Sequence, residues 1–164
     1  MVDLITESEM DFISDNAFYI EKSKLYTDIG KRIRSVEFVR VVNDKLLFVE
    51  ARKSFPNPEN TDDGNLDKYN TQIEEICEKF VHSLNMLSSV EVGVARNGFT
   101  GDFSLQKKLS LVFVFVIKNH QTRWCRSIRK KFIDTLPDYL VTIWEPIVYV
   151  INHNTAIKHG LAVG

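Results

Sequence analysis

The stretch that decides the fold is VEFVRVVNDKLLFVEAR, residues 36–52. Residues 36–42 and 46–52 are rich in β-branched and aromatic side chains, which favour strands over helices. The segment Asn43-Asp44-Lys45 between them is typical of a tight turn. The stretch is therefore predicted to form an antiparallel β-hairpin.

The turn also predicts which side chains meet across this hairpin. If Asn43 and Asp44 are its two central residues, Glu37 lies opposite Glu50, with Cβ atoms about 5 Å apart. Like charges at that separation repel unless a cation compensates them. Side chains alternate along a strand, so Arg52 shares the face of Glu50. The pattern predicts a site made of Glu37, Glu50 and Arg52.

The same charges are also compatible with a hairpin that carries no site. A different loop length would shift the register by one residue and send the two carboxylates to opposite faces. Alternatively, Arg40 and Arg52 simply neutralise acids on an ordinary exposed sheet face. Spacing alone does not choose between these alternatives and a site.

Outward from the hairpin, hydrophobic periodicity predicts the other elements. The best helix has apolar residues at three-four spacing, and one apolar run is hydrophobic on both faces, as in a central strand. We expect a helix or arm in residues 1–17, an extended piece at 18–20, helices at 24–34, 66–87 and 121–136, a central strand within 108–118, a strand at 147–151, and a terminal turn or helix from Asn154.

Length and composition favour a single folded domain over residues 1–164, with a hydrophobic fraction of 44%. The net charge of -1 excludes a protein attracted to polyanions by its overall charge, so nucleic-acid binding would need a local patch. Cys77 and Cys125 have no metal-ligand spacing and are expected to be free, buried thiols. The N-terminus lacks the pattern of a secretory signal, and the apolar run Leu109–Ile117 is too short to span a membrane, so a cytoplasmic protein without membrane contacts is expected.

The hairpin and its flanking elements resemble the PD-(D/E)xK nuclease superfamily. The match is carried by residues 36–38 and 48–56, with an acid on one strand and Glu-Ala-Arg at the end of the next. The chain is also similar to short bacterial proteins of unknown function that have Glu-Ala-Lys-Ser at this place. The resemblance implies an α/β, restriction-endonuclease-like fold, a mixed sheet with an antiparallel hairpin flanked by helices. It further implies that Glu37, Glu50 and Glu21 bind Mg²⁺ or Mn²⁺ for cleavage of DNA phosphodiesters.

The sequence departs from that superfamily at Arg52, which stands where lysine is expected. Guanidinium stays protonated, so Arg52 can stabilise charge but is a poor base. Lys53, which should point to the other face, and Lys79, beside the apolar stripe of the long helix, are the candidate replacements. Three hypotheses follow: a metal-dependent nuclease with Glu37 and Glu50 as ligands, an inactive accessory subunit of a larger bacterial complex, or a nucleic-acid binder without cleavage that uses Arg123, Arg126 and Arg129. We expect the isolated protein to cleave DNA weakly or not at all.

A basic helix face is the other candidate feature. Arg123, Arg126 and Arg129 lie on the helix predicted at 121–136 and are candidate DNA-phosphate contacts. The alternative is a solvated helix face that balances acids elsewhere. The histidines have no metal-ligand spacing and no serine lies in a GxSxG context, so hydrolase triads are unsupported. The sequence leaves the oligomeric state open.

Overall fold

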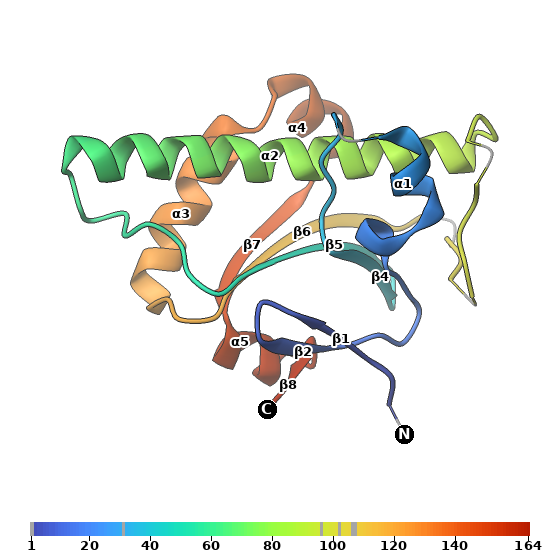
Figure 1. Ribbon diagram of the computed structural model, residues 1–164, viewed down its shortest axis with the longest axis horizontal. Coiled ribbons are helices and arrows are strands. Elements are labelled where there is room, and N and C mark those ends of the chain that lie inside the picture. The colour runs from blue at the N-terminus through green and yellow to red at the C-terminus, as the bar shows by residue number, and fades with distance from the viewer. Residues whose placement is uncertain (1, 31, 96, 102, 106–107) are drawn as a thin grey trace.

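The computed structural model describes residues 2–30, 32–95, 97–101, 103–105 and 108–164. The strands are β1 (Leu4–Glu7), β2 (Met10–Ile13), β3 (Ala17–Phe18), β4 (Phe38–Val42), β5 (Lys45–Arg52), β6 (Ser110–Ile117), β7 (Ile147–Asn152) and β8 (Ala162–Val163). The helices are the 3₁₀ helix η1 (Ile20–Lys22), α1 (Lys24–Ile29), α2 (Asp63–Glu91), α3 (Thr122–Thr135), α4 (Asp138–Trp144) and α5 (His153–Lys158). The fold is therefore α/β, as predicted (Figure 1).

The strands form two sheets. A mixed five-stranded sheet has the order β3-β4-β5-β6-β7, and a small antiparallel sheet has the order β1-β2-β8. The β4–β5 hairpin has the predicted register, because Val42 pairs with Lys45 and Phe38 with Val49. β5 and β6 are parallel from the Lys45–Ser110 pair to the Arg52–Ile117 pair, and β7 continues parallel to β6. The carboxyl ends of β5, β6 and β7 therefore lie at the same end of the large sheet.

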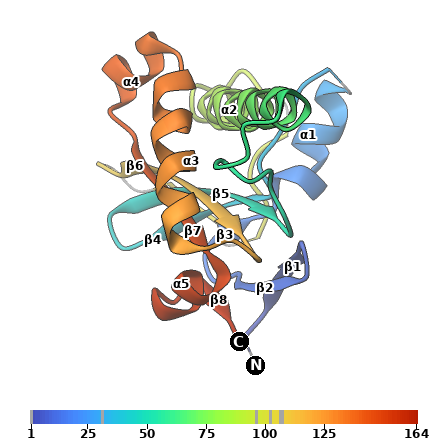
Figure 2. The same ribbon diagram turned by 90° about the vertical axis from the view of Figure 1, so that its left-hand side faces the viewer.

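Helices and the small sheet cover the two faces of the large sheet. Helices α2 and α3 lie on one face, whereas β1, β2, β8 and α5 lie on the other (Figure 2). β6 is buried at every residue after Ser110, so the predicted central strand is confirmed. Its Phe113 packs against Phe80 of α2, with ring centroids 4.5 Å apart. The side chains of β5 alternate between the two layers, with Phe48 toward α2 and Val49 toward the small sheet.

The long helix α2 follows its apolar stripe, as predicted, and is longer at both ends. Its buried residues recur at three-four spacing, which turns one face of the helix onto the sheet. Lys79 lies beside this stripe, and its side chain is only 13% exposed. Helix α2 thus holds the ammonium group of Lys79 in a largely buried position above the large sheet.

Several predictions of local structure are wrong. The helix or arm expected in residues 1–17 is the β1–β2 hairpin, whose turn residues Ser8 and Glu9 have φ values of 51° and 60°. Asn and Gly favour that conformation, and neither is present at the turn, so the usual hairpin signal is missing. Helix α1 ends at Ile29, because Gly30 has φ 93°. Helix α4 and strand β8 were not predicted.

Two further predictions concern the cysteines and membrane-spanning helices. Cys77 and Cys125 are buried and free, as expected. In the described part of the chain, the helices lack an apolar stretch of the length that a membrane span requires.

Candidate metal centre at the carboxyl end of the sheet

Glu50 lies near the carboxyl end of β5, and its side chain is 0% exposed. Its Oε1 lies 2.8 Å from Lys79 Nζ and 3.2 Å from Arg52 Nε. Its Oε2 is buried and has no hydrogen-bond partner in the described part of the chain. Burial raises the pKa of Glu50, and the charges of Lys79 and Arg52 oppose that rise. One carboxylate oxygen of Glu50 is thus held by two cations, and the other has no polar partner among the described residues.

Glu37 directly precedes β4, whose pairing with β5 begins at the Phe38–Val49 pair, and its backbone N–H donates to the carbonyl of Val49 at 3.0 Å. It is 7% exposed, and its Oε2 is buried without a hydrogen-bond partner among the described residues. Burial, first, and then the neighbouring carboxyl of Glu21 and the charge of Glu50 raise the pKa of Glu37 to about 10. Without a bound cation, this carboxyl is therefore protonated at neutral pH.

Two more carboxylates join Glu37 from other elements. Glu7, at the end of β1, and Glu21, in η1, each bring an oxygen so near that the three ligand atoms lie within 4.8 Å of one another. Burial, and then the charge of Glu21, raise the pKa of Glu7. Glu21 was predicted from the resemblance, and Glu7 was missed. No local sequence pattern marks Glu7, because the hairpin that carries it meets the site through tertiary contacts.

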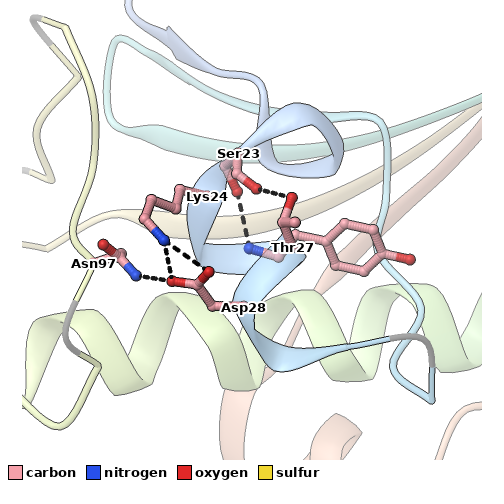
Figure 3. A network of polar contacts seen from close by, with 6 residues as sticks. Ser23, Lys24, Thr27, Asp28 and Asn97 are labelled. Atoms are coloured by element: carbon pink, nitrogen blue, oxygen red, sulfur yellow. Dashed lines mark hydrogen bonds and ion pairs between the residues drawn. The ribbon is translucent and has the colours of Figure 1, made fainter.

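Local hydrogen bonds fix Glu21. Its backbone N–H donates to the carbonyl of Glu37 at 3.3 Å, which joins η1 to the start of β4. Ser23 connects η1 to α1, since its hydroxyl donates to the Ile20 carbonyl at 2.6 Å and accepts from the N–H of Tyr26 at 3.1 Å. Figure 3 shows this cap together with the ion pair of Lys24 and Asp28, one turn apart on α1. The loop that presents Glu21 is therefore anchored at both ends.

The tip of the β1–β2 hairpin is tied to the end of β5. Ser8 Oγ donates to the carbonyl of Ala51 at 3.0 Å. Next to it, the Glu9 carboxylate accepts from Lys53 Nζ at 2.5 Å and from Lys118 Nζ at 3.1 Å. These contacts hold the tip of the β1–β2 hairpin, which follows Glu7, against the residues at the carboxyl ends of β5 and β6.

Lys53 and Lys79, the two candidate replacements for the missing lysine, have different partners in the structure. Lys53 pairs with Glu9 of the hairpin, on the side away from Glu50, as strand alternation predicts. Lys79 reaches Glu50 from α2 and is far more buried than Arg52, whose side chain is 38% exposed. The cation that lies deepest at Glu50 is therefore a lysine, supplied by the helix and not by the strand.

The three arginines on the basic face of α3 do not come together at this centre. Arg123 Nη2 pairs with Glu59 Oε2 at 3.0 Å. Arg129 Nε donates to the carbonyl of Val148, on β7, at 2.7 Å. Arg126 is exposed. These three side chains thus make separate contacts, and the structure does not test the predicted DNA contact.

The donor set suits a hard divalent cation. Carboxylate oxygens are the ligands that Mg²⁺ prefers, at roughly 2.1 Å, and two ligands of one ion can be at most about twice that distance apart. A separation within 4.8 Å for the three oxygens is close to this limit. The buried, unpartnered Oε2 atoms of Glu37 and Glu50 are the independent sign that a partner is missing, since such atoms are costly when unpaired. Of the three ligands that the resemblance implies, Glu21 and Glu37 fit such a cation together with Glu7, whereas Glu50 lies outside this cluster.

Comparisons of this chain with protein-family models, with curated proteins and with solved structures found no match.

Proposed function

We propose that this chain is a divalent-metal-dependent nuclease of the PD-(D/E)xK kind, with a restriction-endonuclease-like fold. The observation that carries the proposal is the cluster of three carboxylates, Glu7, Glu21 and Glu37. Glu50, buried and paired with the sheltered Lys79, lies outside this cluster, and its charge acts on Glu37. The proposed substrate is a DNA phosphodiester and the proposed cofactor is Mg²⁺ or Mn²⁺.

The carboxylates have the role of holding the cation. Glu37, Glu21 and Glu7 would supply the oxygens of one ion, and Glu50, whose Oε2 is also without a hydrogen-bond partner among the described residues, is the predicted ligand that lies outside this cluster. When bound, the ion would polarise the phosphodiester and lower the pKa of an attacking water. The raised pKa of Glu37 means that cation and proton compete for this carboxyl.

Lys79 takes the role that Arg52 performs poorly. Its ammonium group donates to Glu50 Oε1 and orients that carboxylate. It also puts a positive charge where the phosphate gains negative charge during cleavage, which is the electrostatic help that phosphoryl transfer requires. Arg52, at 38% exposure, contacts the same oxygen from the rim of the centre. A lysine at this position removes the main reason to expect an inactive protein.

A second candidate function is an accessory subunit without cleavage activity. The observation that favours it is the exposed apolar surface of α4, where Tyr139, Ile143 and Trp144 are 59%, 71% and 45% exposed. Large exposed apolar side chains are typical of protein interfaces. Such a subunit would bind its partner without needing the carboxylate cluster.

The test is cleavage of supercoiled plasmid DNA in millimolar Mg²⁺ or Mn²⁺. The wild type should nick the plasmid, whereas Glu50→Gln should lose activity and Lys79→Met should lose about a hundredfold or more, the size typical for loss of one transition-state contact. Lys68→Met is the matched control, because Lys68 is an exposed residue of the same helix. Wild-type protein that binds metal and cleaves neither plasmid nor oligonucleotides would favour the accessory subunit.

A further inference from the structure

Two lysines lie opposite each other where β5 and β6 end. The parallel register pairs Arg52 with Ile117. One residue further, the backbone N–H of Lys118 donates to the carbonyl of Arg52 at 2.9 Å, which brings Lys118 beside Lys53. Like charges side by side on neighbouring strands are unfavourable unless an anion compensates them. The ends of these strands therefore form an anion site.

Glu9 occupies that anion site. Its Oε1 lies 2.5 Å from Lys53 Nζ and its Oε2 lies 3.1 Å from Lys118 Nζ, so each carboxylate oxygen has its own ammonium group. A phosphodiester likewise has two non-bridging oxygens on one charged centre. The same pair of lysines can therefore bind a phosphate in the bridging arrangement that Glu9 now has.

We infer that Lys53 and Lys118 form the seat of a backbone phosphate next to the scissile one, and that Glu9 fills this seat until a nucleic-acid strand displaces it. The β1–β2 hairpin links the seat to the metal centre, because Glu7 of the carboxylate cluster and Glu9 are only two residues apart at its turn. The inference rests on the proposed function, because it assigns the path of that substrate.

Displacement of Glu9 is compatible with its surroundings. The side chains of Glu9 and Lys53 are 56% and 57% exposed, and that of Lys118 is 28% exposed. Exposed ion pairs contribute little to stability, since water and salt screen them. A phosphate that is delivered by a strand already bound at neighbouring positions competes at high effective concentration. Glu9 thus lowers the affinity for nucleic acid without closing the site permanently.

The experiment is fluorescence anisotropy with a fluorescein-labelled short DNA, single-stranded and duplex, in EDTA so that no cleavage occurs. Glu9→Gln should bind about threefold to tenfold more tightly than the wild type. Lys118→Ala should bind more weakly, and its plot of log affinity against log salt should be shallower by roughly one phosphate contact, about 0.7–0.9 in slope. Glu9→Gly is the second variant, because glycine tolerates the positive φ of the turn and removes the carboxylate.

Matched controls separate a local effect from a change in net charge. Glu91→Gln makes the same charge change at the far end of α2, and Lys45→Ala removes a lysine at the opposite end of β5. Equal effects of Glu9→Gln and Glu91→Gln, or an unchanged salt slope in Lys118→Ala, would overturn the phosphate seat and leave the proposed function intact. Absence of DNA binding by both wild type and Glu9→Gln would also overturn the phosphate seat, whereas the proposed function is tested separately by plasmid cleavage in Mg²⁺ or Mn²⁺.

Discussion

Replacing Lys79 by methionine tests whether this lysine is the main partner of Glu50. Methionine keeps the length, the apolar stem and nearly the helix propensity of lysine, and it removes the charge. Loss of one member of a buried ion pair costs about 3–5 kcal/mol. Here the loss is smaller, because Arg52 stays 3.2 Å from Glu50 and the carboxyl can take a proton. We expect the free energy of unfolding to decrease by about 2–3 kcal/mol, the scale of one charge-assisted hydrogen bond.

Arg52→Met provides the contrast. Arg52 is 38% exposed, against 13% for Lys79, so water screens its interaction with Glu50. Its removal should cost less than about 1 kcal/mol. Lys68→Met, on the exposed face of α2, should be close to neutral.

Urea denaturation in EDTA, followed by circular dichroism, measures all three variants. For a domain of this size, a loss of 2–3 kcal/mol corresponds to a melting temperature lower by roughly 5–10 °C. The loss for Lys79→Met should be smaller at about pH 5 than at about pH 8, because Glu50, whose pKa is raised, is protonated more fully at the lower pH. A cost for Lys79→Met that equals or falls below that of Arg52→Met would refute the assignment of Lys79.

Three further measurements address the site and the core. Because the pKa of Glu37 is raised from 4.5 to about 10, the folded state keeps a proton that the unfolded state releases, so the contribution of this carboxyl to metal-free stability should be complete below about pH 4.5 and be lost as pH rises toward 10. Thermal melts in EDTA should show this decrease with pH, and Glu37→Gln should flatten it. Mg²⁺ should raise the melting temperature more at higher pH. The same dependence of melting temperature on pH in wild type and Glu37→Gln would contradict the protonated carboxyl. With Lys79 in place, Arg52→Lys should change plasmid nicking only a few-fold, since both cations meet the same Glu50 oxygen; a large gain would mean that Lys79 does not act in cleavage. Phe113→Ala should cost about 3–5 kcal/mol in urea denaturation through lost packing against Phe80, and a cost below about 1 kcal/mol would show that β6 is not central to the core.

The sequence by itself determined the elements whose signals are local. The β4–β5 register follows from one tight turn and strand alternation, so the pairs from Phe38–Val49 to Val42–Lys45 were predictable. The long helix and the central strand follow from apolar periodicity that a single segment displays in full. The acid Glu21 was predicted through the resemblance, and the structure brings it beside Glu37.

Tertiary structure alone decided how the centre is completed. Glu7 joins the cluster because the β1–β2 hairpin packs under the large sheet, and its turn has no Asn or Gly to mark it in the sequence. Lys79 meets Glu50 because α2 crosses the sheet at one particular position along its length, and periodicity gives the buried face of a helix but not that position. Contacts between segments far apart in the chain depend on how whole layers pack, so no local pattern of residues contains them.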